Sequence, residues 1–281
     1  MDMQAFPSSL VLVGAGKMGA AMLEGWLGAG LSPQAVTVLD PAPSAALQQM
    51  AAQVGFVLQG GDANAGVNSA KPKPADVVVL AIKPQMLDEA AESFAPWVGA
   101  DSLVVSVLAG KTVGNLMARL PQTQAIVRAM PNLPASVLRG MTGCYAAPSV
   151  SQAQKAMAQR LLEAVGAVEW VAEEALIDSV TAVSGSGPAY VFLLVECLAA
   201  AAEQEGLPPA IAANLARTTI EGAGELLRQS DLAPATLRQN VTSPGGTTAA
   251  ALEVLMASDG LAPLLARAVR AARLRAEALS G

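Results

Sequence analysis

The sequence predicts two domains of different class, an α/β domain with a parallel sheet over residues 1–172 and an all-helical domain over residues 173–281. In the first part, short unbroken apolar runs alternate with segments of helical periodicity. This alternation is typical of parallel strands that helices cover on both faces. Convincing strands stop after Glu173, where the sequence becomes rich in Ala and Leu. A chain of 281 residues is long enough for two such cores.

The first predicted strand covers residues 10–13 and ends at Gly14, and a helical pattern over residues 18–27 follows it. Four-residue apolar runs bounded by turn residues are typical of buried strands. The later strand candidates are 36–39, 76–82, 103–108 and 125–128, with helical patterns at 42–54, 85–94 and 113–120 between them, and a hairpin-like strand pair near 143–146 and 168–171 flanks a helix at 151–165.

In the second part, a helix at 174–183 is broken by Ser184-Gly185-Ser186-Gly187. Pro188 suits the first position of the long apolar helix that runs to Glu205, because proline has no N–H to leave unpaired there. Further helices are predicted at 209–229, 234–240, 248–257 and 261–279.

Composition limits the classes of partner. Apolar residues make up 53% of the chain and charged residues only 14%, which favours a surface partly covered by a second copy. The net charge of −6 argues against nucleic acid and anionic membranes as partners. The apolar run over residues 10–31 contains Lys17, Glu24 and six glycines, so it resembles neither a signal peptide nor a membrane span. We therefore expect a cytoplasmic protein.

The chain contains no histidine and only two cysteines, Cys144 and Cys197. A histidine general base, a Ser-His-Asp triad and a histidine-ligated metal are therefore excluded. Two distant cysteines do not supply a zinc site either. We expect no bound metal.

Gly14-Ala15-Gly16-Lys17-Met18-Gly19 is a G-x-G-x-x-G motif between a predicted strand and a predicted helix. In a dinucleotide-binding fingerprint, Gly14 forms the tight turn, Gly16 lets the backbone approach the pyrophosphate, and Gly19 lets helix and strand pack closely. The motif therefore predicts a Rossmann-like domain in which Gly14, Gly16, Lys17, Met18 and Gly19 contact the cofactor.

Asp40 at the end of the second strand bears on the choice of cofactor. A carboxylate there accepts hydrogen bonds from the adenine ribose and repels a 2′-phosphate, and no Lys or Arg lies between Asp40 and Lys71. These residues favour NAD. The alternative is that Asp40 merely caps the following helix.

Two further strand ends should face the cofactor, because ligands of such sheets bind outside the carboxyl ends of the strands. Ala81, Lys83 and Pro84 follow the strand at 76–82, and Ala109 follows the strand at 103–108. The alternative for Lys83 is a solvated loop lysine.

Asn240–Thr248 is a run rich in hydroxyl groups and glycine that precedes a predicted helix. Free N–H groups and the helix dipole let such a loop hold an anion without a cationic side chain. The alternative is an ordinary capped helix start. Ser184 and Ser186 leave a similar choice open between a ligand contact and a simple helix break.

Taken together, the chain resembles the pyrroline-5-carboxylate reductase family over almost its entire length. The motifs that carry the resemblance are Gly14–Gly19, Ala81–Gln85, Met130–Asn132, Ser184–Tyr190 and Asn240–Thr248.

The resemblance implies an N-terminal dinucleotide domain, an all-α C-terminal dimerisation domain that interlocks with a second subunit, an active site at the dimer interface, and larger rings of dimers. It also implies that Thr248 donates a hydrogen bond to the nitrogen of pyrroline-5-carboxylate. Further roles implied by resemblance are Ser243, Gly246 and Thr247 at the substrate carboxylate, Ser184 and Ser186 near the substrate, and Asn68 at the ribose end of the cofactor.

The sequence departs from the family at the cofactor site. Many members have an amide side chain at the position of Lys17, and many have Ser or Arg where this chain has Asp40-Pro41-Ala42. The family commonly uses NADP(H), so the departure leaves the choice between NADPH and NADH open.

The missing acid–base residues fit the reduction of an imine. No lysine follows Lys155, whereas ketone reduction requires an acid to protonate the forming alkoxide. A protonated cyclic imine needs only orientation and a neutral donor. A β-hydroxyacid dehydrogenase, which needs a lysine in its helical domain, is the weaker alternative. A reductase of another imine and a non-catalytic nucleotide sensor also remain alternatives.

Overall fold

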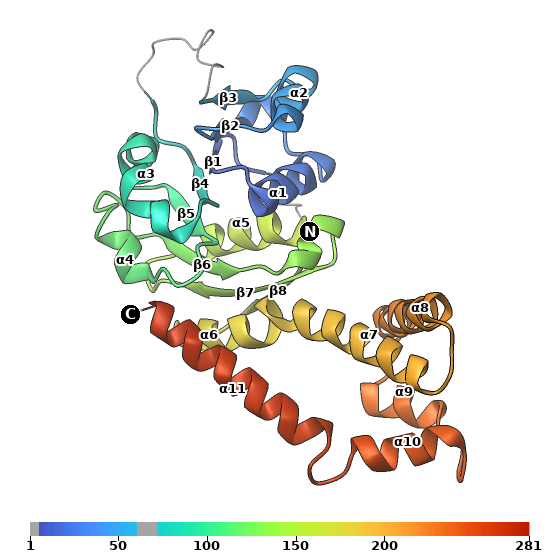
Figure 1. Cartoon of the computed structure of the whole chain (residues 1–281). Coiled ribbons are helices and arrows are strands. Elements are labelled where there is room, and N and C mark those ends of the chain that lie inside the picture. Colours follow the sequence, from blue (N-terminus) through green and yellow to red (C-terminus); the bar gives the residue numbers. More distant parts are fainter. Residues whose placement is uncertain (1–5, 61–71, 281) are drawn as a thin grey trace. The chain divides into compact units, whose positions relative to one another are not determined.

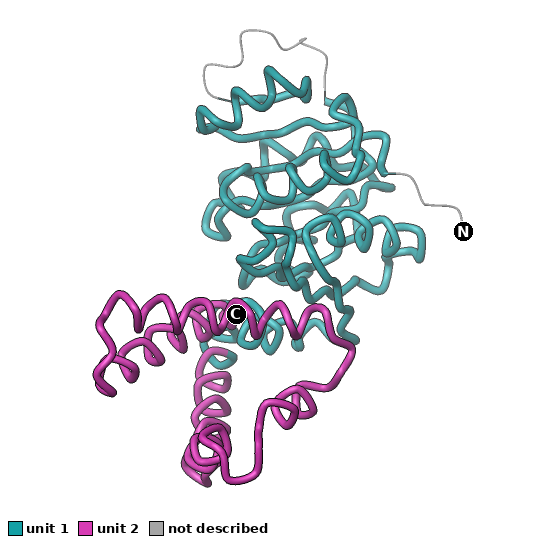
Figure 2. The backbone as a smooth tube through the Cα atoms, turned by 90° about the vertical axis from the view of Figure 1, so that its right-hand side faces the viewer, with its two compact units in different colours: residues 1–185, 273–281 teal, residues 186–272 magenta. Residues whose placement is uncertain are grey.

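The computed structural model describes residues 6–60 and 72–280. The chain forms two compact units, shown in Figure 2. Unit 1 comprises Met1–Gly185 and Arg273–Gly281, and unit 2 comprises Ser186–Ala272. These packing units differ from the two domains expected from the sequence, because the segment after residue 172 and the end of the last helix pack within unit 1. The packing units therefore do not test the predicted domain boundary between residues 172 and 173, which stays a prediction.

Unit 1 is built on one eight-stranded sheet with the strand order β3-β2-β1-β4-β5-β6-β7-β8 (Figure 1). Strands β1 to β6 pair in parallel, β7 pairs antiparallel with β6, and β8 is parallel to β7. The bounds are β1 Leu10–Val13, β2 Val36–Leu39, β3 Val57–Gln59, β4 Val77–Leu80, β5 Leu103–Ser106, β6 Ile126–Met130, β7 Gly140–Ala146 and β8 Gly166–Trp170.

The hairpin-like pair expected for the last two strands is wrong. Parallel strands cannot be joined by a tight turn, and helix α5 (Gln152–Glu163) makes the crossover between β7 and β8. The two strands start in direct backbone contact, since a Cβ atom on Gly166 would lie 2.0 Å from the carbonyl oxygen of Gly140. The short strand β3 was not predicted.

The helices otherwise follow the predicted pattern with shifted ends. Helix α2 begins at Ala45 because the hydroxyl of Ser44 accepts the N–H of Leu47 at 3.2 Å. The segment predicted as one helix before Ser184 consists of α6 and a π-helix at Thr181–Gly185. The helix bounds are α1 Lys17–Gly28, α2 Ala45–Val54, α3 Leu87–Phe94, α4 Val113–Met117, α6 Leu176–Val180, α7 Gly187–Gln204, α8 Pro209–Gln229, α9 Pro234–Asn240, α10 Thr247–Leu255 and α11 Leu261–Ser280.

Apolar cores lie on both faces of the sheet, as unbroken apolar strands require. On one face, Trp26 of α1 is fully buried and its indole N–H donates to the carbonyl of Leu161 at 2.7 Å. On the other face, Phe94 of α3 and Leu116 of α4 are fully buried. Because β1, β4, β5 and β6 pair in parallel, their carboxyl ends meet at one edge of the sheet.

Ser8 and Ser9, just before β1, form hydrogen bonds with Asp76, just before β4. The carboxylate of Asp76 accepts the hydroxyl of Ser8 at 2.6 Å and the backbone N–H groups of Ser8 and Ser9. The N–H of Asp76 donates to the hydroxyl of Ser9 at 2.9 Å. The hydrogen bond from Ser8 is the main reason that the pKa of Asp76 lies below its ordinary value of 3.8.

The two cysteines lie in contrasting environments. Cys144 on β7 is buried, and burial raises the pKa of its thiol to about 12. Cys197 on α7 is exposed.

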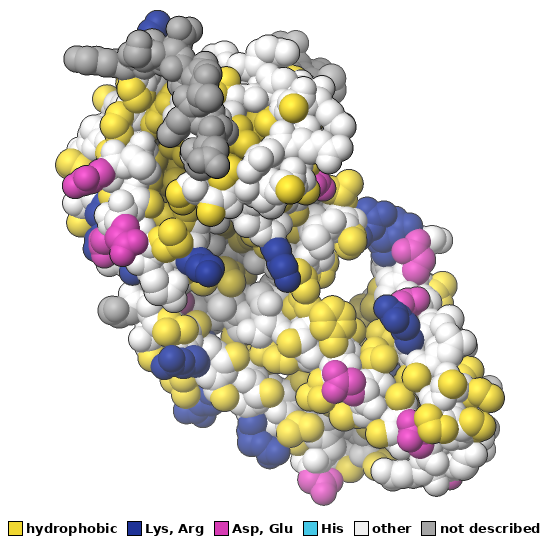
Figure 3. All heavy atoms as spheres, turned by 45° about the horizontal axis from the view of Figure 1, so that its top comes forward, with side chains coloured by type: hydrophobic (Ala, Val, Ile, Leu, Met, Phe, Trp, Pro, Cys, Tyr) yellow, Lys and Arg dark blue, Asp and Glu magenta, His cyan; other side chains and the backbone are white. Residues whose placement is uncertain are grey.

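Unit 2 consists of helices whose apolar side chains are largely exposed. Figure 3 shows hydrophobic side chains on this part of the surface, with Arg and Asp or Glu side chains scattered between them. On α7 alone, Phe192 and Leu193 are more than half exposed. The helical stretch Leu176–Gln204 has 29 residues, and an 18-residue window within it has a mean hydropathy of 1.5, so by length and composition alone it is able to cross a membrane. The π-helix at Thr181–Gly185 interrupts its α-helical geometry.

Helix α1 lies in backbone contact with the turn after β1. A Cβ atom on Gly19 would lie 2.2 Å from the carbonyl oxygen of Gly14, a distance that real Cβ atoms do not reach. Gly14 has a φ of +85°, which favours glycine.

We expect Gly19→Ala to lower the free energy of unfolding by about 2 kcal/mol or more, because α1 must shift away from the sheet. The matched control is Gly28→Ala at the end of the same helix, where nothing lies within 4 Å of the added Cβ atom. Urea denaturation measures both. Equal stability of the two variants would contradict the close packing.

We expect Ser8→Ala to lower the free energy of unfolding at neutral pH by about 1 kcal/mol. The folded-state pKa of Asp76 is lowered, so this stabilisation is present above pH 3.8 and is lost as pH falls through the folded-state pKa. Denaturation curves recorded from neutral pH down through the acidic range should therefore show a difference between wild type and variant that is full at neutral pH and shrinks as pH falls below 3.8. A difference that stays constant over this range would contradict the role of the ionised carboxylate.

Candidate functional site

The glycine-rich turn forms the centre of the carboxyl edge of the sheet. The N–H of Gly14 donates to the carbonyl of Leu39 at 2.8 Å, and the N–H of Ala81 donates to the carbonyl of Val13 at 2.8 Å. These bonds hold the carboxyl ends of β1, β2 and β4 side by side at the same edge of the sheet. The structure therefore brings the Gly14–Gly19 turn and Ala81 together, as predicted from the sequence.

Helix α1 begins at this edge with an open N-terminus. Gly16 is its N-cap residue and no side chain caps it. A Cβ atom on Gly16 would meet nothing within 4 Å, so the backbone is open to a ligand there. Lys17 is exposed and Met18 is half-buried at the first turn. Free N–H groups and the helix dipole at such an end attract a phosphate.

Asp40 is bound to the same turn. Its Oδ2 atom accepts the N–H of Ala15 at 2.8 Å and its Oδ1 atom accepts the N–H of Ala42 at 3.0 Å. The alternative that Asp40 caps helix α2 is wrong, because Ser44 is the N-cap of that helix. The carboxylate instead lies half-buried beside the glycine turn, where a nucleotide ribose would approach it.

A cavity of about 390 Å³ opens next to Asp40. The ends of β1, β2 and β3 and the first turns after β4 line it. Its charged lining residues are Asp40 and Glu89, and among the described residues that line it there is no Lys or Arg. The cavity is therefore acidic and lies where the second strand ends.

The remaining predicted cofactor residues lie at neighbouring strand ends. Lys83 is exposed and begins the short 3-10 helix Pro84–Met86 after β4. Ala109 is exposed in the turn after β5. Asn68 lies outside the described residues.

Asn132 joins this edge to the π-helix. Its side-chain amide donates to the carbonyl and to the hydroxyl of Ser184, both at 3.2 Å, and its Oδ1 atom accepts the N–H of Met141 at 2.9 Å. In the sequence, Met130–Asn132 supports only the family resemblance, and no role is predicted for Asn132. No local pattern signals a contact across 52 positions.

The hydroxyl of Ser184 is thereby engaged within unit 1, since it also donates to the carbonyl of Met141 at 3.4 Å. Ser186 begins unit 2 as the N-cap residue of α7, and its side chain makes no cap hydrogen bond. The two serines, predicted together, thus lie on either side of the boundary between the units.

The substrate loop predicted from the sequence lies in unit 2, at the start of α10. Gly245 has a φ of +69°, and the N–H of Gly246 donates to the carbonyl of Ser243 at 3.0 Å. Gly246 is the N-cap residue and no side chain caps the helix. Thr248 is half-buried, whereas Ser243 and Thr247 are exposed. The loop therefore has the geometry of an anion-binding helix N-terminus.

The chemistry open to these groups is limited to binding and orientation. The chain has no histidine, and within the loop the side-chain donors are the amide of Asn240 and hydroxyl groups, all of them neutral. Such groups hold an anion or a substrate nitrogen but do not protonate an alkoxide effectively.

Two family models match the chain, one over its N-terminal part and one over its C-terminal part. Residues 9–110 match the model described as NADP oxidoreductase, coenzyme F420-dependent, and residues 174–279 match that of pyrroline-5-carboxylate reductase dimerisation. The chain is thus an NAD(P)H-dependent oxidoreductase with a Rossmann-like domain and an all-α dimerisation domain, as its sequence predicted.

Individual relatives show to which family of oxidoreductases the chain belongs. A pyrroline-5-carboxylate reductase of Pseudomonas aeruginosa is 39% identical, with 96% of each chain covered. The structure of one from Coxiella burnetii is 36% identical and superposes with a TM-score of 0.86 over 98% of this chain and 99% of that one. The chain belongs to the pyrroline-5-carboxylate reductase family. A Plasmodium falciparum member, 25% identical with a TM-score of 0.76 over 99% and 100% of the two chains, was solved with NADP bound.

Proposed function

We propose that this protein transfers a hydride from NAD(P)H to 1-pyrroline-5-carboxylate and so produces L-proline, the final step of proline biosynthesis. The observation that carries the proposal is the uncapped N-terminus of α10 with the half-buried Thr248 beside it. In a chain of this family without histidine, this arrangement suits an anionic cyclic imine.

The residues of the loop have separate roles in this proposal. The carboxylate of the substrate is held by the free N–H groups at the start of α10 together with Ser243, Gly246 and Thr247. The hydroxyl of Thr248 holds the ring nitrogen, and Ser184 and Ser186 lie near the ring. This binding orients C5 of the ring toward the cofactor.

The reaction needs no protein acid. NAD(P)H, when bound, supplies a hydride. The protonated imine carries a positive charge on its C=N bond, and the arriving electron pair forms the new C–H bond while the π electrons become a lone pair on nitrogen. Charge is thereby cancelled at the ring. Orientation of this kind contributes up to about 7–11 kcal/mol in favourable cases.

The cofactor is held in this proposal by unit 1. The phosphates meet the N-terminus of α1 at Gly14, Gly16, Lys17, Met18 and Gly19, and the ribose end meets Asp40 and Asn68. Ala81, Lys83, Pro84 and Ala109 line the remainder. The acidic cavity around Asp40 and Glu89 disfavours a 2′-phosphate, so we propose that the protein uses NADH as well as NADPH.

Self-association follows from the dimerisation domain. The exposed apolar side chains of α7 and α8 border a cavity of about 730 Å³ in unit 2, lined among others by Phe192, Ala199 and Ile220. We propose that a second copy covers this face, that the dimers assemble into larger rings, and that the protein works in the cytoplasm without nucleic acid or membrane. The domain division at 172 and 173 is part of the same proposal, and the dimerisation match begins at residue 174.

The activity is tested by the loss of reduced-nicotinamide absorbance when pyrroline-5-carboxylate is added, in parallel with NADPH and NADH. Turnover supports the proposal, and formation of proline identifies the product. Cofactor binding without turnover of this imine would contradict it. A panel of other cyclic imines would then separate a different imine reductase from a nucleotide sensor.

Thr248→Ala should lower kcat by roughly 10- to 1000-fold, because the lost hydrogen bond strengthens in the transition state. Thr248→Ser retains the hydroxyl and serves as the matched control, so it should keep most of the activity. Steady-state kinetics with saturating cofactor measure the effect. Unchanged kinetics in Thr248→Ala would contradict the role of its hydroxyl.

Asp40→Ala should raise the ratio of kcat/KM for NADPH over NADH by about tenfold, because a negative charge next to the 2′-position is removed. Asp101→Ala provides the control, since Asp101 is an exposed carboxylate just before β5, at the amino end of that strand. Its ratio should equal that of wild type. If both variants give the wild-type ratio, Asp40 has only a structural role.

A further inference from the structure

The turn after β5 is held from three directions. At its start, the N–H of Leu108 donates to the hydroxyl of Ser106 at 3.3 Å. In its middle, Gly110 has a φ of +72° and lies against the last turn of α11, since an added Cβ atom would be 2.8 Å from the carbonyl oxygen of Leu279. After its end, the N–H of Val113 donates to the carboxylate of Glu174 at 2.7 Å.

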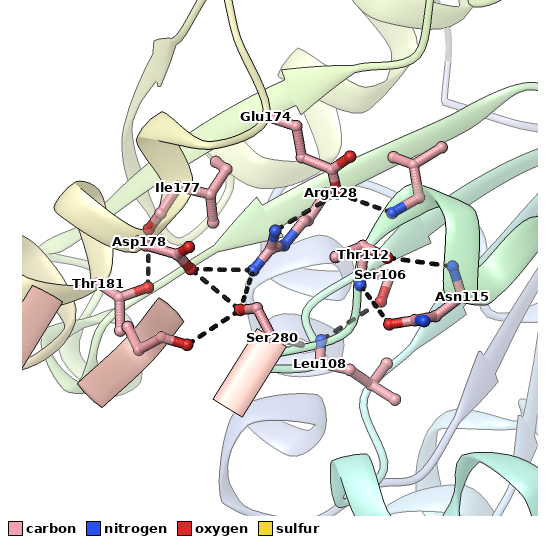
Figure 4. A network of polar contacts seen from close by, with 12 residues as sticks. Ser106, Leu108, Thr112, Asn115, Arg128, Glu174, Ile177, Asp178, Thr181 and Ser280 are labelled. Carbon is pink, nitrogen blue, oxygen red and sulfur yellow. Dashed lines mark hydrogen bonds and ion pairs between the residues drawn. The ribbon is translucent and has the colours of Figure 1, made fainter. Parts of the chain in front are cut away.

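Two of these three contacts lead to one buried arginine, Arg128 on β6, which Figure 4 shows at the centre of a polar network. Its guanidinium lies 3.3 Å from Glu174 and 3.5 Å from Asp178, and its side chain is only 4% exposed. The Glu174 oxygen that faces Arg128 is the one that accepts the N–H of Val113. The ion pair therefore fixes the start of α4, immediately after the turn.

The same arginine holds the end of α11. The hydroxyl of Ser280 accepts a hydrogen bond from the guanidinium of Arg128 at 3.5 Å, and its one proton is shared between two acceptors at 3.1 Å, the carboxylate of Asp178 and the carbonyl of Ala276. Ser280 follows Leu279, whose carbonyl meets Gly110. All of these residues belong to unit 1.

We propose that the last turn of α11 is a positioning element for the turn after β5. Ser280, through Asp178 and Arg128, holds Leu279 against Gly110 and so sets the backbone of Leu108–Gly110 at the carboxyl edge of the sheet. Ser280 is a positioning residue, because it acts on the cofactor through this turn and does not touch it. The inference rests on the proposed function to the extent that Ala109 contacts the cofactor.

Several features make the network suited to this task. A buried arginine between two carboxylates has few alternative arrangements, because moving either partner leaves a charge without compensation. The turn itself has an exposed residue, Ala109, between the constrained positions Leu108 and Gly110. A ligand that meets Ala109 therefore meets a backbone whose conformation is fixed from behind, which reduces the ordering needed on binding.

The test is Ser280→Ala, which removes one hydroxyl near the end of the chain and leaves the buried ion pairs intact. The matched control is Glu277→Gln, which breaks the exposed pair with Arg273 on the same helix turn. Neither substitution alters a residue assigned to cofactor or substrate binding.

Three readouts are compared with wild type. Amide hydrogen exchange over residues 107–113 should become faster in Ser280→Ala without any cofactor present. The Kd for NADPH, from nucleotide fluorescence, should rise about three- to tenfold. The KM for cofactor should rise in parallel, while the KM for pyrroline-5-carboxylate stays at the wild-type value. Glu277→Gln should match wild type in all three.

Exchange and Kd values in Ser280→Ala equal to those of wild type would overturn the inference, as would a lower Tm with unchanged exchange and Kd, which indicates a purely stabilising role. The proposed function is tested separately by the wild-type protein. If wild type binds NADPH and reduces the imine while Ser280→Ala behaves identically, only the role of Ser280 fails.

Discussion

The backbone contact between Gly19 and the carbonyl of Gly14 is the constraint on which the nucleotide-binding unit depends. Because α1 lies this close to the end of β1, its free N–H groups lie level with the ends of the neighbouring strands. The ladder bond from Ala81 to Val13 and the bond from Gly14 to Leu39 then bring three strand ends to the same edge. A bulkier residue at position 19 would separate the helix dipole from this edge and leave the sheet without an anion site.

Much of this architecture could be predicted because it depends on patterns within short segments of the sequence. Unbroken apolar runs predict buried parallel strands, and the glycine spacing predicts the turn before α1. Strand β3 (Val57–Gln59) was missed because the apolar run that includes it, Phe56–Leu58, is only three residues long. The parallel pairing of β7 and β8 was missed because pairing direction depends on the route of the intervening helix. Contacts such as Asn132 with Ser184 join distant positions, and a single sequence carries no signal for them.

The proposed function relies on two helix N-termini, one in each unit. In that proposal the start of α1 in unit 1 offers amide groups to a nucleotide, and the start of α10 in unit 2 offers them to a carboxylate. Neither helix has a side-chain cap, so in both places the orphan donors stay free for a ligand. Two anion sites of this kind would need few cations, in agreement with the low charge content of the chain. In the proposal, specificity then depends on neighbouring side chains such as Asp40 and Thr248.

The contrast between the two thiols gives the protein a built-in labelling position. Cys144 stays protonated and shielded at any pH that the folded chain would ordinarily meet, because burial raises its pKa to about 12. Cys197 is exposed on α7, inside the segment that matches the dimerisation family. In the single chain a maleimide therefore reacts on one known helix without any engineered cysteine. Because we propose that a second copy covers α7, the rate of this reaction would report how far the chains have associated.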